Sequence, residues 1–118
     1  MFEYYNANPN KYNIDDCTIR ALSVAENISW SEAYNLLSNS ARKYGLMQSD
    51  VRAIEDYLDL RYDRIPFNEK KVGEFIDNHP YGTYLITMRG HITVVKDGIN
   101  YDTFDPKDRR IWSVWQVL

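Results

Sequence analysis

The chain has 118 residues, of which 44% are hydrophobic and 26% are charged. This length and composition predict one globular domain spanning residues 1–118 and exclude a largely disordered chain. Asp and Glu total 17 against 14 for Lys and Arg, and the two signs are interspersed, so we expect no nucleic-acid partner.

The sequence also indicates where the protein resides. Residues 1–10 show no basic segment followed by an apolar run, and no stretch approaches the roughly 20 apolar residues of a membrane span. We therefore expect a cytoplasmic protein without a membrane partner. Cys17 is the single cysteine, which agrees with a reducing compartment and leaves a free thiol. Nothing in the sequence indicates the oligomeric state.

The first part of the chain predicts an arm followed by a helix. Residues 1–14 are rich in Asn and Tyr and predict an irregular arm. Asp15 and Asp16 offer an N-cap directly before an apolar helical pattern, so the first helix is expected to begin at Cys17.

Three more helices are predicted before residue 80. Ser29 and Glu32 have capping-box spacing and begin a second helix that runs toward Gly45. A third helix is expected after Ser49, followed by a short strand over residues 60–65. A fourth begins after a cap at Asn68 and ends at His79-Pro80, because a residue before proline disfavours the helical conformation.

After Gly82 the pattern changes to extended segments rich in β-branched and aromatic residues: 83–88, 91–95, 99–104 and 111–117. Turn residues separate these segments, so an antiparallel meander is expected. Helices followed by a sheet, without βαβ alternation, predict an α+β fold in which N-terminal helices pack on a C-terminal antiparallel sheet.

The position of Cys17 favours a reactive thiol. A cysteine in the first turn of a helix lies near unpaired N–H groups and the positive end of the helix dipole, which favour thiolate. A lone cysteine is more often a small buried hydrophobe, and the neighbouring Asp15 and Asp16 oppose a second negative charge unless they point away. A histidine partner is therefore needed to stabilise the thiolate.

Two histidines are available. His79 lies in a predicted turn before Pro80, where we expect a solvent-exposed structural role. His91 begins the strand 91–95 directly after Arg89-Gly90, so its side chain emerges at one end of the sheet.

The third member of the site follows from the hairpin register. Asp97-Gly98 predicts a two-residue hairpin loop, which sets Thr93 opposite Asp102. His91 and Asp102 are then diagonal neighbours on one face, about 7–8 Å apart between backbones, and their side chains can meet. A loop one residue longer or shorter would favour Asp105 instead. A carboxylate on one imidazole nitrogen leaves the other free to take the thiol proton.

Three segments carry a resemblance to a known family: Asn13-Ile-Asp-Asp-Cys-Thr-Ile-Arg-Ala-Leu, Gly90-His-Ile-Thr-Val-Val-Lys-Asp-Gly and Tyr101-Asp-Thr-Phe-Asp. Together they resemble small papain-like cysteine peptidase proteins of phages and bacteria, and are distantly similar to the leader-peptide peptidase domains of bacteriocin exporters. The resemblance implies a papain-like fold with Cys17 as nucleophile, His91 as general base and acid, and Asp102 as the orienting acid.

One position departs from that family. Papain-like enzymes usually carry a glutamine six residues before the nucleophile as an oxyanion-hole donor, and Lys11 stands there in this chain. Asn10 and Asn13 are the candidate replacements, although turn asparagines more often serve their own loop. Losing one oxyanion donor typically costs about 10²- to 10³-fold in rate.

The leading hypothesis is a cysteine hydrolase that acts on a peptide, isopeptide or related amide bond of a peptide or protein substrate. The alternative is a catalytically inactive papain-like module, of a kind that a phage would encode, that binds and inhibits a host protein in the host cytoplasm. A surplus of aromatic residues supports it: Tyr4, Tyr5, Tyr12, Trp112 and Trp115. Trp112 and Trp115 are three apart, so one is expected in the core and the other partly exposed.

Metal and cofactor chemistry is not indicated. No pair of cysteine or histidine residues has the spacing of metal ligands, and the chain has no glycine-rich phosphate loop. We therefore expect no metal and no cofactor.

Overall fold

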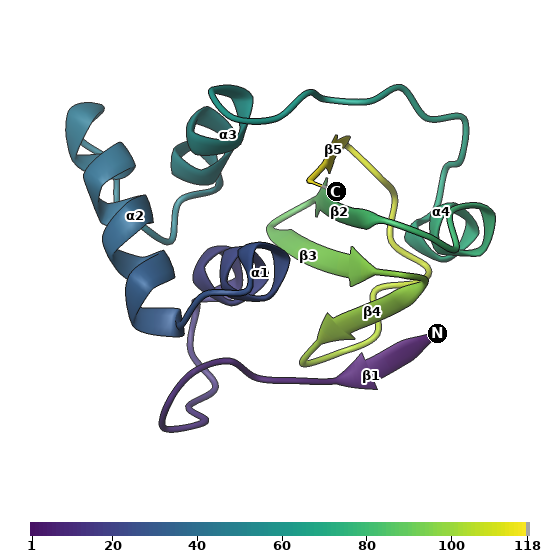
Figure 1. The fold of residues 1–118 in the computed structure, drawn as a ribbon, viewed down its shortest axis with the longest axis horizontal. Helices are drawn as coiled ribbons and strands as arrows, with labels where there is room; N and C mark the ends of the chain where they lie inside the picture. Colours follow the sequence, from purple (N-terminus) through teal and green to yellow (C-terminus); the bar gives the residue numbers. More distant parts are fainter. Residues whose placement is uncertain (118) are drawn as a thin grey trace.

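A five-stranded sheet with helices on both faces is the framework of the protein (Figure 1). The computed structural model describes residues 1–117. Its strands are β1 (Phe2–Tyr4), β2 (Thr83–Met88), β3 (His91–Lys96), β4 (Ile99–Asp102) and β5 (Ser113–Gln116). Its helices are α1 (Cys17–Glu26), α2 (Trp30–Lys43), α3 (Val51–Asp59) and α4 (Val72–Asn78). The fold is α+β, as the sequence predicts.

The sheet is mixed, so the prediction of an antiparallel sheet is wrong at one edge. The strand order is β1-β4-β3-β2-β5, and β1 runs parallel to β4. The arm predicted over residues 1–14 therefore begins with a strand. Three residues carry too little pattern to predict a strand, and β1 exists only because the outer edge of β4 is there to pair with it.

The last strand departs from a simple meander. β2, β3 and β4 follow one another as predicted, but β5 pairs with β2 at the opposite edge of the sheet. β1 already covers the outer edge of β4, and the connection from β4 to β5 passes along α4. There the backbone N–H groups of Val72 and Gly73 donate to the carbonyls of Arg109 and Lys107.

Two local predictions also need correction. The strand predicted over residues 60–65 is reduced to one bridge between Arg64 and Trp115. The N-cap of α4 is Lys71 and not the predicted Asn68, whereas α3, expected after Ser49, begins at Val51 with Asp50 as its N-cap. These differences are small because a helix pattern locates its apolar face better than its first residue.

The start of α2 is confirmed. The Ser29 side chain accepts from the Glu32 N–H, and the Glu32 carboxylate accepts from the Ser29 N–H. The two bonds satisfy helix-end donors that would otherwise lack partners.

Two hydrophobic clusters hold the layers together. The first lies between α1, α2, α3 and one face of the sheet, and includes Leu22, Leu37, Leu58, Ile92, Val94 and Trp115. The second lies between α4 and the other face, and includes Val72, Phe75, Ile86, Val95 and Val114. Figure 1 shows α1 between the sheet and the α2–α3 pair. Because α1 packs on the sheet, its first turn, which contains Cys17, lies against the sheet.

Trp112 and Trp115 behave as their spacing predicts. Trp115 is fully buried, whereas Trp112 is 57% exposed. Within residues 1–117 no helix is both long and apolar enough to cross a membrane.

Candidate active site

The hairpin between β3 and β4 has the predicted register. Asp97 and Gly98 both have positive φ, 49° and 78°, as a two-residue hairpin loop requires. Lys96 pairs with Ile99, and two further pairs follow in step. The register therefore continues toward Thr93 and Asp102, as the sequence argument expects.

His91 and Asp102 are in direct contact. His91 Nε2 lies 2.7 Å from Asp102 Oδ2, and both side chains are buried. Asp105, the alternative acid, is exposed, and its carboxylate accepts from the backbone N–H of Lys107. The geometry thus assigns the contact with His91 to Asp102.

Other groups hold the Asp102 carboxylate in place. Thr93 Oγ1 donates to Oδ2 at 2.6 Å, and the backbone N–H of Thr103 donates to Oδ1 at 2.7 Å. Asn100 Nδ2 donates to Thr93 Oγ1, which obliges the threonine hydroxyl to use its own hydrogen on Asp102. Burial alone would raise the pKa of Asp102, but these bonds and the nearby His91 lower it.

Cys17 completes the group from the first turn of α1. The Cys17 side chain is near enough to the His91 ring to contribute to the raised pKa of that ring. Burial would lower the pKa of His91, but Asp102 and Cys17 together raise that pKa from 6.5 to about 9. Because Nε2 is taken by Asp102, Nδ1 is the ring nitrogen left for the thiol.

The Cys17 and His91 side chains are almost completely buried. Cys17 is 7% exposed and His91 is 6% exposed, and Cys17 belongs to the cluster beneath α1. The Phe104 ring lies 4.6 Å from the His91 ring, and the Arg109 guanidinium lies over Phe104. The thiol is therefore packed in the core, as expected for a lone cysteine, and its reactivity stays a prediction.

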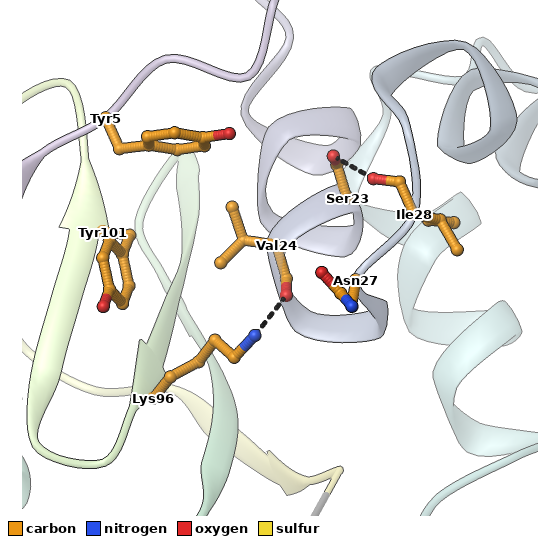
Figure 2. A pocket seen from close by; sticks show the side chains of 7 residues that line it. All are labelled: Tyr5, Ser23, Val24, Asn27, Ile28, Lys96 and Tyr101. Atoms are coloured by element: carbon orange, nitrogen blue, oxygen red, sulfur yellow. Dashed lines mark hydrogen bonds between the residues drawn. The ribbon is translucent and has the colours of Figure 1, made fainter.

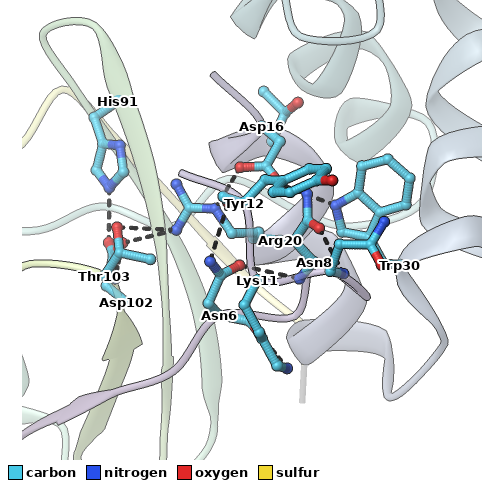
Figure 3. A network of polar contacts seen from close by, with 12 residues as sticks. Asn6, Asn8, Lys11, Tyr12, Asp16, Arg20, Trp30, His91, Asp102 and Thr103 are labelled. Carbon is cyan, nitrogen blue, oxygen red and sulfur yellow. Dashed lines mark hydrogen bonds and ion pairs between the residues drawn. The ribbon is translucent and has the colours of Figure 1, made fainter. Parts of the chain in front are cut away.

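Asp16 is the N-cap residue of α1, but its side chain does not cap the helix. Its Oδ1 instead accepts from Arg20 Nε at 2.7 Å, and its Oδ2 accepts from Trp30 Nε1 and Asn8 Nδ2. Arg20 Nη1 reaches on to Asp102 Oδ1 at 3.2 Å. Figure 3 shows this network running from the N-terminal arm to His91.

The two candidate oxyanion donors receive no support from these contacts. Asn10 and Asn13 are both exposed, and the bond that Asn10 makes is from its backbone N–H to Asn8 Oδ1. Asn6 and Asn8 are the buried asparagines of the arm, and they brace its turn. Among residues 1–117 the backbone N–H of Cys17 has no hydrogen-bond partner, so that group is a donor available beside the sulfur.

Comparison with known proteins identifies no relative of this chain. No protein-family model matches the chain, and neither a curated protein nor a solved structure shows a significant match. Function must therefore be argued from the site itself.

The sequence argument missed part of the network. Arg20 lies four residues after Asp16 and three after Cys17, and residues at these spacings are neighbours on a helix surface. That signal was available in the sequence. The roles of Asn8 and Trp30 were not, because the fold alone brings the arm and α2 to the Asp16 carboxylate.

The remaining candidate residues lie elsewhere. His79, expected in a solvent-exposed turn, is packed: its ring stacks on Phe75 with centroids 3.8 Å apart, and its Nδ1 lies 2.8 Å from the Phe75 carbonyl. The part of the chain that the structure describes contains no group of three or more His, Cys, Asp or Glu side chains able to hold a metal ion.

A separate cavity of about 240 Å³ lies toward the C-terminal end of α1 (Figure 2). Tyr5, Ser23, Val24, Asn27, Ile28, Lys96 and Tyr101 line it. Lys96 Nζ crosses it to the Val24 carbonyl at 3.1 Å, which places a positive charge where the helix ends. Its lining residues include no member of the Cys17–His91–Asp102 group.

The raised pKa of His91 predicts a pH-dependent stability. The folded protein holds this proton more tightly than the unfolded chain, so the stabilisation is complete below about pH 6.5 and is lost as pH rises through about 9. We expect the free energy of unfolding in urea to fall across that range by at most about 3 kcal/mol. Asp102 works in the other direction, because its lowered pKa gives stability that is lost only in acid.

The matched control is His91→Gln, which keeps a polar side chain but cannot titrate. Its stability should be flat over the same range. An equal alkaline decline in this variant would show that other groups are responsible.

Proposed function

We propose that the protein is a cysteine hydrolase acting on peptide, isopeptide or related amide bonds, with Cys17, His91 and Asp102 as its catalytic triad. The observation that carries the proposal is the 2.7 Å contact between His91 and the buried Asp102 carboxylate, together with Cys17 at the start of α1, which also contributes to the raised pKa of His91. This is the arrangement that nucleophilic catalysis by cysteine needs: a nucleophile, a base beside it and a group that orients the base.

The chemistry follows from the three positions. His91 Nδ1 takes the Cys17 proton, and the thiolate adds to the carbonyl carbon of the amide. The tetrahedral oxyanion collapses, the C–N bond breaks, and the leaving amine takes the proton from His91. A thioester remains, and His91 then removes a proton from water, which attacks the thioester and releases the acid and the thiol.

Two further features support this function. The unpartnered N–H of Cys17, at the positive end of α1, is a donor available to an oxyanion formed beside the sulfur. The order of a nucleophile on the first long helix and a base and acid on the following sheet agrees with a papain-like fold, which we include in the proposal. Because Cys17 and His91 are almost fully buried, this function requires the residues that cover them to move when a substrate binds.

The test is the pH profile of Cys17 alkylation by iodoacetamide. In the native protein the reaction should remain fast at about pH 6, because the imidazolium stabilises the thiolate. In His91→Ala the rate at about pH 6 should fall at least tenfold, while the rate at about pH 9.5 changes little. A native profile that rises only near pH 8.5, where an ordinary cysteine ionises, would count against the hydrolase.

A second candidate function is a non-catalytic module that binds and inhibits a host protein. Exposed aromatic side chains favour it, since Tyr4 is 65%, Tyr12 61% and Trp112 57% exposed. The two functions differ in their dependence on sulfur. Cys17→Ala should abolish hydrolysis but leave binding intact, so full biological effect of that variant would select the binding module.

A further inference from the structure

Asp16 poses an electrostatic problem for the proposed site. It immediately precedes Cys17, it is 2% exposed, and its side chain makes no cap bond with α1. A buried carboxylate on the residue next to Cys17 opposes a second negative charge on the sulfur. Asp102 adds another buried carboxylate on the far side of His91.

Arg20 forms an ion pair with each of these two carboxylates. Its Nε lies 2.7 Å from Asp16 Oδ1 and its Nη1 lies 3.2 Å from Asp102 Oδ1, and its side chain is only 11% exposed. Burial would lower the pKa of Arg20, but the two aspartates raise it above its ordinary value. A guanidinium therefore supplies a positive charge that does not vary with pH in the working range.

Few other charges face this point. The start of α1 contributes Asp16 and Arg20, β3 contributes His91, and β4 contributes Asp102. After β4, the Arg109 guanidinium lies over the Phe104 ring, which packs against His91. Among the described contacts α2 contributes the neutral Trp30 N–H, and the arm contributes the neutral amide of Asn8. Lys96 binds the Val24 carbonyl near the other end of α1.

We propose that Arg20 is a positioning residue that sets the charge of the site: by neutralising Asp16 and Asp102 together, it allows Cys17 to ionise below neutral pH. This role rests on the proposed hydrolase function. It makes the working pH range of the site depend on a residue outside the triad. Cys17 and Arg20 are three apart on α1, so their side chains are neighbours and the charge acts at short range.

The experiment is a charge series read by alkylation with iodoacetamide, which is neutral and so is not itself attracted or repelled. For each variant the rate at about pH 6 is divided by the rate at about pH 9.5, which cancels differences in access to the sulfur. Removing a positive charge makes proton loss harder. In Arg20→Gln the low-pH part of the alkylation profile, where the rate rises as Cys17 ionises, should therefore shift upward by about one pH unit. This corresponds to a roughly tenfold lower ratio of the rate at about pH 6 to the rate at about pH 9.5.

Asp16→Asn separates charge from structure, because it breaks the same network but removes a negative charge. The low-pH part of the profile should shift to lower pH, and the double variant Asp16→Asn/Arg20→Gln should fall between the two single variants. Arg20→Lys should keep most of the ratio. Arg52→Gln is the control for charge alone, since Arg52 is exposed and pairs with Asp50 on α3.

The outcomes distinguish the two proposals. Two results would overturn the role of Arg20 while the native protein still reacts at low pH: a profile that does not shift in Arg20→Gln, or one that shifts in the same direction in Asp16→Asn as in Arg20→Gln. Either result would leave the hydrolase proposal intact. A native profile without reaction at low pH would overturn both. If Arg20→Gln does not fold, Arg20→Lys and Asp16→Asn still decide, and the ultraviolet absorbance of the thiolate gives a second readout.

Discussion

Replacing Asp102 by asparagine is expected to lower the free energy of unfolding at neutral pH by about 3–5 kcal/mol, the usual cost of breaking a buried, hydrogen-bonded ion pair. Four donors converge on this carboxylate, from His91, Thr93, Arg20 and Thr103. An asparagine offers one oxygen to them and turns two N–H hydrogens toward the rest. Urea unfolding at about pH 7 measures the loss.

The same variant should change the titration of His91. Burial, which lowers the pKa of this imidazole, would then be opposed by Cys17 alone, so the ring should titrate well below about 9. Nuclear magnetic resonance of the ring protons follows this directly. Alkylation of Cys17 at about pH 6 should slow at least tenfold in parallel, because the imidazolium is lost.

Asp50→Asn is the matched control. Asp50 also pairs with an arginine, Arg52, but at the exposed start of α3, and asparagine serves equally well as an N-cap there. Its stability should scarcely change. If Asp102→Asn were as stable as this control and His91 still titrated near 9, the contact between His91 and Asp102 would be energetically unimportant.

The second large effect is expected at Trp115, the anchor of β5. Its ring is fully buried in the cluster under α1, its Nε1 donates to Asp59 Oδ1 at 2.9 Å, and the Arg64 guanidinium lies over its face. Trp115→Ala removes the largest side chain of the core. We expect a loss of about 3–5 kcal/mol, or a melting temperature lower by about 15 °C or more.

Two variants sharpen that measurement. Trp112→Ala removes the same side chain from a position that is 57% exposed, so its effect should stay within about 0.5 kcal/mol. Trp115→Phe keeps an aromatic ring but loses the N–H bond to Asp59, and should fall between the two. Equal losses for Trp112→Ala and Trp115→Ala would mean that β5 does not depend on this anchor.

Local patterns predicted much of the candidate site. The Asp97-Gly98 loop determines which residues face one another, and from it the contact between His91 and Asp102 follows by counting. The helix start at Cys17 was also predictable, because a cap residue and an apolar stripe lie within a few positions of each other. Such features depend on neighbours in the chain, which a sequence displays directly.

Contacts over long sequence separations could not be predicted in this way. The pairing of β1 with β4 and the return of β5 to β2 depend on which sheet edges remain open after the hairpins form. The contacts made by the charged groups around Cys17 likewise depend on the tertiary structure. Asp16 was expected to cap α1, but its carboxylate turns to Arg20 and Trp30, because buried charge-assisted bonds outweigh a single cap bond.

The sequence by itself therefore determined the α+β class, the hairpin register and the three residues that carry the proposed chemistry. Only the tertiary structure decided that the thiol is nearly buried, that the sheet is mixed, and that Arg20 joins the two carboxylates on either side of the site. The physical reason is that periodicity and turn residues act over a few positions, whereas burial and electrostatics depend on everything that packs nearby.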